Sequence, residues 1–338
     1  MCYTDTQLMT KKYYIGIDVG GTKILGGVVS ADGEIFARHK VPTPKEGNPK
    51  SVLAAVSEVI AVMLSEANIP IQKISGMGVG IPGMVDTEKG KILVTANLQL
   101  SGDRFAVRLQ RKYGIPVTLG NDVNLGVLGE SWLGSAKGLR NVVGIFPGTG
   151  VGGGIIVNGQ LMTGAHGSAA EVGHMLIDPN GPKCSCGNRG CLEAFAGRWA
   201  IERDIRKAVA DGKKTIITEL TDGKLRAIKS KLLKKALKKK DPVVVAILRN
   251  VSHTLGLACV SLRHLYDPEL IVFGGGVIEA CGEFMMPLIT SAVLRDPFFA
   301  GAGKCRIVTA ALGDDAVMLG AVALAKEAAS AHQRIALK

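Results

Sequence analysis

The sequence predicts an α/β protein made of two duplicated lobes, and three observations support this fold class. Strand and helix signals alternate along the 338 residues, as is typical of α/β domains. The segment GIDVGGTKILGGVV at 16–29 aligns with GIFPGTGVGGGIIV at 144–157, and each reads as a strand, a glycine-rich turn and a second strand. Hydrophobic residues make up 47% of the chain, enough for a large core in two lobes.

The order of the elements follows from their patterning. YYIGIDV and the hairpin around Asp32-Gly33 are β-rich, SVLAAVSEVIAVMLSEA reads as an apolar helix, and GMGVGIPG and IPVTLGND read as buried strands. Long helices are expected at about 193–211 and 242–266, followed by the strand ELIVFGGG and the helix DDAVMLGAVALAKEAA. We therefore expect two copies of a βββαβαβα unit, although a chance likeness of two glycine-rich hairpins is the alternative.

The division between the lobes is expected near residue 122. Residues 1–122 with 315–338 should form a small lobe, and 123–314 a larger one. A ligand cleft is expected between the two copies.

Composition favours a cytoplasmic protein. The first residues, MCYTDTQLMTKK, hold no apolar run of signal-peptide length, and no later stretch reaches about 18 uninterrupted apolar residues. No membrane association is therefore expected. Seven cysteines are an odd number, and four of them are scattered, at Cys2, Cys259, Cys281 and Cys305. This argues against a secreted disulfide framework and favours reduced thiols.

The net charge of +12 is concentrated in one segment. KLRAIKSKLLKKALKKK at 224–240 holds nine Lys and Arg residues and no acidic one, and its apolar residues fall at helical spacing. An amphipathic basic helix of this kind can bind anionic lipid or polyphosphate, but a solvated face of a packed helix is the simpler interpretation. No nucleic-acid partner is expected.

Glycine-rich turns predict a site for a phosphate chain. In DVGGTK, Gly20 and Gly21 let backbone N–H groups approach an anion, while Thr22 adds a hydroxyl and Lys23 a positive charge. Asp18 can hold a metal ion directly or through water. The turn with Gly148, Thr149 and Gly150 supplies a matching set of amides. Each turn alone could be purely structural, but the pair favours a clamp on a polyphosphate tail.

A third glycine run follows a buried strand. Gly274, Gly275 and Gly276 could let the adenosine part of a nucleotide lie flat on the backbone. A simple strand-to-helix turn is the alternative.

Asn121 and Asp122 follow a buried strand, at the edge where open α/β sheets bind their ligands. An aspartate that faces a bound phosphate chain can accept the proton of an attacking hydroxyl. We therefore predict Asp122 as a general base. A helix N-cap is the other common role for a carboxylate at this place.

His174, Cys184, Cys186 and Cys191 have the spacing of a metal site, H-x9-C-x-C-x4-C. Three thiolates and an imidazole suit tetrahedral Zn²⁺, and four protein ligands leave no open position, so the zinc should be structural. A Cys184–Cys186 disulfide is geometrically poor and unsuited to the cytosol. The second ring nitrogen of His174 could orient a sugar-facing group, and Glu171 and Glu193 could each hold a pair of hydroxyls unless they are plain surface carboxylates.

These motifs together resemble the ROK family, which comprises sugar kinases and sugar-responsive repressors of the actin-like ATPase (ribonuclease H-like) fold. IGIDVGGTK, GVGIPG, GNDVN, GTGVGGG, AEVGHM, CSCGNRGCLE and FGGGV occur in the family's order over residues 13 to about 328. The resemblance implies ATP, Mg²⁺ and a structural Zn²⁺ as cofactors, a small-molecule hexose as substrate, and a homodimer or homotetramer.

The resemblance also implies roles for single residues. Asp122 corresponds to the base that activates the sugar 6-hydroxyl, and the metal and phosphate-loop residues named above match the family's zinc and ATP sites. The implied sugar ligands are Gly83, Asn97, Asn121, Asp122, Glu171, His174 and Glu193.

Departures from the family's pattern bear on the choice of sugar. ANLQLSGDR keeps Asn97 but lacks the aromatic residue that many members carry nearby, and Phe146 and Pro147 replace more polar residues before the second glycine turn. Glucose is the favoured substrate because the stretch after GNDVN resembles the glucokinase branch. N-acetylglucosamine, mannose, N-acetylmannosamine and fructose stay open, since one substituent is discriminated by loop shape.

Two classes of function remain. The first is an ATP-dependent hexose kinase, and the second is a sugar-responsive regulator. Repressor relatives carry a helix-turn-helix module ahead of the first strand, whereas 12 residues precede Tyr13 here. With Asp122 also present, the kinase is favoured. A kinase that takes inorganic polyphosphate as donor is a third option, suggested only by the basic segment.

Overall fold

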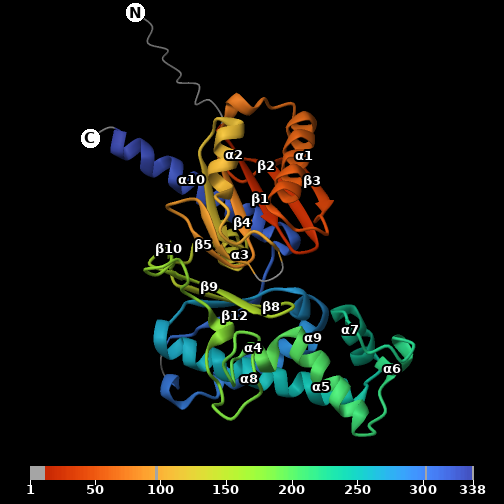
Figure 1. Cartoon of the computed structure of the whole chain (residues 1–338). Helices are drawn as coiled ribbons and strands as arrows, with labels where there is room; N and C mark the ends of the chain where they lie inside the picture. The colour runs from red at the N-terminus through yellow and green to blue at the C-terminus, as the bar shows by residue number, and fades with distance from the viewer. Residues whose placement is uncertain (1–11, 96–97, 301–302, 337–338) are drawn as a thin grey trace, which may run out of the picture. The chain divides into compact units, whose positions relative to one another are not determined.

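The computed structural model describes residues 12–95, 98–300 and 303–336. The chain divides into two compact units (Figure 1). The first unit is Met1–Gly129 with Asp315–Lys338, and the second is Glu130–Asp314. The division falls seven residues after the expected one, inside helix α3 (Asp122–Leu133), because the first turns of this helix pack in the first unit.

The first unit is a five-stranded sheet in the order β3-β2-β1-β4-β7. β2 is antiparallel to β1 and β3, and β4 is parallel to β1 and β7. Its strands are β1 (Tyr13–Val19), β2 (Lys23–Ser30), β3 (Ile35–Pro42), β4 (Ile74–Ile81) and β7 (Val117–Asn121), and β5 (Met84–Asp86) and β6 (Lys91–Val94) form a small hairpin. Its helices are α1 (Pro49–Ala67), α2 (Phe105–Tyr113), the start of α3, and α10 (Ala316–Ala336), with a 3₁₀ turn at Ile71–Lys73.

Glycines let α10 lie directly on the sheet. A Cβ at Gly16 of β1 or at Gly78 of β4 would collide with the α10 carbonyls of Met318 and Ala321. Helix α1 packs on β2 and β3, and its apolar face is fully buried at residues such as Val56. β1, β2 and β4 are buried along almost their whole length, whereas the edge strand β3 is half-buried or exposed along its length.

The second unit repeats this topology, with the sheet order β10-β9-β8-β11-β12. Its strands are β8 (Val142–Pro147), β9 (Val151–Val157), β10 (Gln160–Leu161), β11 (Leu270–Phe273) and β12 (Arg306–Thr309). Its helices are α4 (Glu193–Ala196), α5 (Arg198–Ala210), α6 (Ile216–Leu220), α7 (Ser230–Lys238), α8 (Pro242–Tyr266) and α9 (Gly276–Leu294), with 3₁₀ turns at Val172–His174, Pro297–Phe299 and Gly313–Asp315.

The internal repeat is therefore real, and each copy begins with the hairpin expected from the sequence. Val19 pairs with Ile24 in the first hairpin and Pro147 pairs with Val151 in the second. The second glycine turn is one residue shorter, so the two turns cannot have identical backbones.

The helix expected over about 193–211 is wrong in one respect. It is broken at Gly197, whose backbone is extended (φ −66°, ψ 149°), into α4 and α5. Gly197 lies against Glu193 and Gly150, where a Cβ would come within 2.9 Å of the Glu193 carbonyl. Periodicity alone did not reveal this break, because the residues on both sides keep helical spacing.

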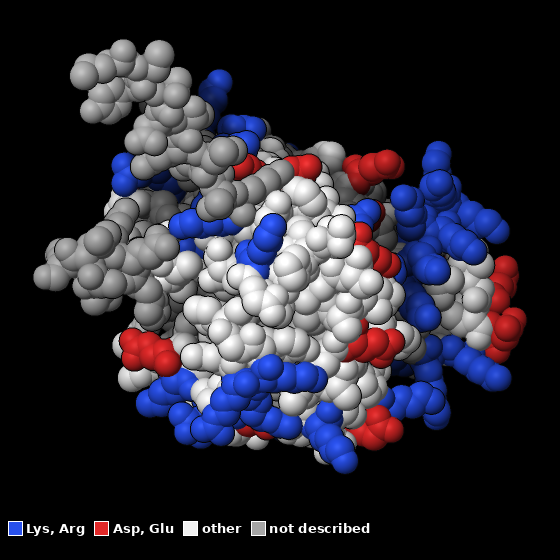
Figure 2. Space-filling model, turned by 90° about the horizontal axis from the view of Figure 1, so that it is seen from above, with Lys and Arg blue, Asp and Glu red and all other residues white. Residues whose placement is uncertain are grey.

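The basic helix expected over 224–240 is shorter than predicted. Ala227 takes a left-handed backbone (φ 54°), which α-helices do not tolerate in their interior, and α7 begins at Ser230. Ile228 and Leu233 are buried in the core of the second unit, whereas all nine basic residues of the segment are exposed. Lys and Arg side chains gather at the right of Figure 2, the side on which Figure 1 draws α7.

Among the described residues, α8 and α9 are long and apolar enough to cross a bilayer. They pack against each other, and 50% and 39% of their most apolar windows are buried within the protein. Length and composition do not separate such core helices from membrane spans, so this finding is weak evidence for a membrane protein.

Candidate active site

The first glycine turn joins β1 to β2 and is held by Thr43, the residue directly after β3. Gly20 donates its N–H to the Lys23 carbonyl at 2.9 Å. Thr43 donates its hydroxyl to the Gly20 carbonyl at 2.6 Å and its N–H to the Thr22 carbonyl at 3.1 Å. Gly21 and Thr22 are exposed. The turn thus has a fixed backbone and an open side, as binding of a phosphate chain requires.

Asp18 and Lys23 flank this turn. Asp18 is buried at the end of β1, and Lys23 is half-buried at the start of β2. A carboxylate and an ammonium group therefore stand on the two strands that carry the turn.

Asn121 and Asp122 lie at the junction of β7 and α3. Asn121 Oδ1 accepts the N–H of Asn124 at 3.0 Å, which is the bond of a helix N-cap. Its Nδ2 donates to the Gly83 carbonyl at 3.0 Å. Gly83 has φ 130° and no room for a Cβ beside the Val94 carbonyl. The structure therefore brings Gly83, Asn121 and Asp122 together.

Asp122 was alternatively expected to be the N-cap of a helix, but in the structure Asn121 has this role. Asn121 caps α3, whereas Asp122 is the first residue of the helix and accepts the N–H of Val123 at 3.0 Å through Oδ1. Its side chain is only half-buried. Asn97, the other sugar ligand expected in this part of the chain, lies outside the described residues.

The second glycine turn, in the second unit, is held by hydrogen bonds with residues of α4 and α5. Glu193 Oε2 accepts the N–H of Val151 at 3.0 Å, and a Cβ at Gly150 would collide with the same carboxylate. The first N–H groups of α5, at Arg198 and Trp199, donate to the carbonyls of Gly148 and Thr149 at 3.1 and 3.3 Å.

Arg198 places a guanidinium beside this turn and was missed by sequence reasoning. Its Nη2 donates to Thr149 Oγ1 at 3.0 Å, and its Nε lies 3.5 Å from Glu202. The sequence carried no signal for this contact, because one unbroken helix was expected over about 193–211. Thr43, which holds the first turn, carried none.

The third glycine run connects β11 to α9. Gly274 lies against the ring of Phe146, where a Cβ would come within 3.0 Å of ring atoms. Gly275 has φ 80° and is the N-cap of α9, without a side-chain hydrogen bond at the cap. A Cβ at Gly276 would lie 3.8 Å from Ser230 Oγ, and no other described atom outside its chain neighbours and the backbone of α9 would come within 4 Å. Phe146, one of the two residues that depart from the family pattern before the second glycine turn, therefore packs against Gly274.

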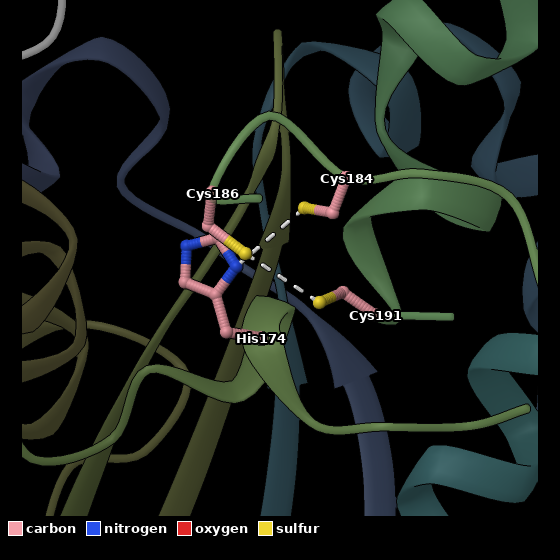
Figure 3. A group of neighbouring side chains, drawn as sticks. All are labelled: His174, Cys184, Cys186 and Cys191. Carbon is pink, nitrogen blue, oxygen red and sulfur yellow. Dashed lines mark hydrogen bonds between the residues drawn. The ribbon is translucent and has the colours of Figure 1, made fainter. Parts of the chain in front are cut away.

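Figure 3 shows the predicted metal ligands with their side chains directed toward one another. His174 comes from the 3₁₀ turn Val172–His174, and the cysteines come from the loop before α4. One ligand atom from each residue lies within 4.8 Å of the other three. His174 Nδ1 is 3.8 Å from Cys184 Sγ, and Cys186 Sγ is 3.7 Å from Cys191 Sγ.

These distances fit a tetrahedral zinc ion. Zn–S bonds of about 2.3 Å place tetrahedral ligand atoms about 3.8 Å apart. Burial raises the pKa of Cys191 to about 12 and also raises that of Cys184, while the backbone N–H of Asn188 lowers the pKa of Cys186. Thiols with raised pKa values, such as those of Cys184 and Cys191, ionise when a cation binds, which is the chemistry of a structural zinc site.

Glu171 lies close enough to His174 and Glu193 to interact with both electrostatically. Desolvation raises the pKa of the Glu171 carboxyl group; His174 opposes this shift and Glu193 adds to it. The residue still keeps an exposed side. The second unit thus gathers Glu171, His174 and Glu193 with the metal ligands and the second glycine turn.

Comparison with known proteins identifies the family of this chain. The family model described as "ROK family" matches residues 14–328. The chain belongs to the ROK family. ROK kinases have the actin-like ATPase fold, and the repeated five-stranded sheets described above agree with it.

Individual members of the family are similar over almost the whole chain. The glucokinase of Thermotoga maritima is 33% identical over 320 residues, which span 94% of this chain and 99% of the relative. A xylose repressor of Caldicellulosiruptor bescii is 30% identical and is matched over 77% of its length. The structure of a ROK family glucokinase from Streptomyces griseus, in complex with glucose and AMPPNP, has a TM-score of 0.79 and 31% identity, covering 93% of this chain and 99% of that one.

Proposed function

We propose that this ROK protein is an ATP-dependent glucokinase, which converts ATP and D-glucose to ADP and D-glucose 6-phosphate. The observation that carries the proposal is Asp122, a half-buried carboxylate at the carboxyl end of β7, in a chain that matches a glucokinase over 99% of that enzyme's length. Neighbouring Asn121 takes the capping role.

In the proposed reaction, Asp122 accepts the proton of the glucose 6-hydroxyl while the hydroxyl oxygen attacks the γ-phosphorus of ATP. The bond to the β,γ-bridging oxygen breaks, and ADP leaves. The amides of the two glycine turns and the Lys23 ammonium group stabilise the negative charge on the transferring phosphoryl group. Asn121 keeps the β7–α3 junction in place through its bond to Gly83.

Two metal ions belong to the proposal. Asp18, buried beside the first glycine turn, would hold Mg²⁺ directly or through water, and this ion supplies positive charge to the phosphates. His174, Cys184, Cys186 and Cys191 would hold a Zn²⁺ that fixes the loop before α4.

The sugar-binding groups of the second unit are Glu171, His174 and Glu193. The structure shows that Glu193 accepts hydrogen bonds from protein donors. A hydrogen bond from a sugar hydroxyl would therefore be an additional one on this carboxylate. The exposed side of Glu171 is better placed to accept hydrogen bonds from sugar hydroxyls.

We further propose that the enzyme works in the cytoplasm and forms a homodimer or homotetramer. Light scattering of the purified protein tests the oligomeric state, and a monomer at micromolar concentration would contradict it.

Assays with inorganic polyphosphate in place of ATP test whether the exposed basic segment at 224–240 recruits a second donor.

A hexose panel tests the function. Release of ADP is measured with glucose, mannose, fructose, N-acetylglucosamine and N-acetylmannosamine, and the product is identified by phosphorus NMR. We expect the highest kcat/KM with glucose, and Asp122→Asn gives the background. Preference for another sugar would move the protein to that kinase class. Sugar binding without phosphoryl transfer would favour the regulator class, which the similarity to xylose repressors keeps in view.

A further inference from the structure

One hydroxyl group connects the metal loop to the second glycine turn. Ser185 stands between two of the metal ligands, Cys184 and Cys186. Its Oγ donates to Glu193 Oε1 at 2.8 Å. The other oxygen of this carboxylate accepts the N–H of Val151, directly after the glycine turn. The chain of contacts therefore runs from the metal loop through one carboxylate to the backbone of the turn.

The carboxylate fits tightly at the turn. Gly150 has no room for a Cβ because the Glu193 carboxylate occupies that space. Trp199 Nε1 also donates to Oε1, at 3.4 Å. A shift of the carboxylate by a few tenths of an ångström would therefore change where the backbone around Gly150 lies.

The turn has other supports that do not depend on Ser185. Arg198 and Trp199 hold the carbonyls of Gly148 and Thr149 through their backbone N–H groups. Loss of the Ser185 hydroxyl should therefore leave the turn folded but loosen the carboxylate that sets its final position.

We propose that Ser185 is a positioning residue for the nucleotide: it holds Glu193 against the second glycine turn and thereby couples the metal loop to the phosphates of ATP. The inference deepens the proposed function, because it takes ATP as the ligand of this turn. Metal binding then serves the nucleotide site as well as the sugar site. The side chain of Ser185 is exposed, so its removal creates no cavity.

The test compares Ser185→Ala with Ser185→Thr, which keeps a hydroxyl. Binding of AMPPNP with Mg²⁺ is measured by calorimetry without sugar or turnover, and zinc content by mass spectrometry. A hydrogen bond to a charged acceptor at an exposed site should be worth about three- to tenfold in the AMPPNP dissociation constant. We expect this loss in the alanine variant, near wild-type affinity in the threonine variant, and full zinc content in both.

The matched control is Asn188→Ala, an exposed position in the same loop, which should bind AMPPNP like the wild type. Unchanged AMPPNP binding by Ser185→Ala would overturn the inference, and so would loss of zinc from it, because Ser185 would then act on the metal site. An equal loss in Asn188→Ala would also overturn it. If the wild-type protein fails to bind AMPPNP at all, the proposed function itself fails.

Discussion

Glu171 is the carboxylate whose ionisation should limit glucose binding in acid. Its pKa lies above the usual value of 4.5, chiefly through desolvation. The protonated carboxyl group accepts hydrogen bonds from sugar hydroxyls more weakly than the carboxylate does, because it has lost its charge and one of its oxygens has become a donor. Glucose binding is therefore complete above the raised pKa and is lost as the pH falls through it. Calorimetry without nucleotide, from pH 8 down to the limit of folding, should show affinity fall about tenfold, with a midpoint above pH 4.5.

The variant Glu171→Gln provides the comparison. It should bind glucose more weakly at neutral pH, and its affinity should no longer fall as the pH is lowered through the pKa of Glu171. An acid limb of the same midpoint in Glu171→Gln would assign the titration to another group and remove Glu171 from the sugar site.

Glu130 shows how much one buried carboxylate can stabilise. It is fully buried, and its oxygens accept the N–H groups of Ser135, Ala311 and Leu312 at 2.8 to 3.1 Å. The variant Glu130→Ala leaves these donors without an acceptor, so we expect a loss of about 3 kcal/mol or more in the free energy of unfolding. Urea unfolding followed by circular dichroism measures it.

The exposed Glu283 of α9 supplies the control, since Glu283→Ala should change the free energy of unfolding by less than about 0.5 kcal/mol. Equal effects of the two substitutions would show that the bonds of Glu130 contribute nothing.

At the scale of elements, the contact of α10 with the first sheet depends on glycine. Gly78→Ala would place a methyl group where the Ala321 carbonyl lies, and the helix would have to move. We expect the free energy of unfolding to fall by about 1–3 kcal/mol, measured by thermal unfolding. Gly303→Ala is the control, because among the described residues, its chain neighbours aside, no atom lies within 4 Å of its Cβ position. A Gly78→Ala protein as stable as Gly303→Ala would mean that the backbones are not in close contact.

The elements also show what the sequence could and could not reveal. The doubled hairpin, α1, α8 and α10 were visible because long apolar periodicity and glycine turns are local signals. The break at Gly197 was not visible, since its cause is contact with Glu193 and Gly150 of the same unit. The late start of α7 depends likewise on the backbone of Ala227.

The candidate site also has features that could be predicted from the sequence and features that could not. The cysteine spacing predicted the cluster of Figure 3 because its ligands are close in sequence. The hydrogen bonds of Glu193 to Ser185 and Val151 were not predicted, because Glu193 was expected either to hold sugar hydroxyls or to be a plain surface carboxylate. Arg198 was missed because its contact with Thr149 spans 49 residues of sequence.

For the whole molecule, the division into two units predicts a local response to removal of the proposed zinc ion. A strong chelator should expose the loop that contains the four ligands, so amides of 172–192 should exchange with deuterium at least about tenfold faster. Amides of β1 and β4, in the other unit, should keep their protection. Hydrogen exchange with mass spectrometry follows both sets, and equal loss of protection throughout would show that the metal site supports the entire fold.

The central claim is that Asp122 takes the proton from the sugar hydroxyl. The variant Asp122→Asn keeps an oxygen for the N–H of Val123, so it should fold and bind zinc normally. The deciding measurement is the rate of glucose 6-phosphate formation by this variant at saturating glucose and ATP. We predict a fall of about 10²-fold or more, with glucose and AMPPNP binding within about threefold of wild type. A variant that keeps more than a tenth of the wild-type rate would contradict the claim.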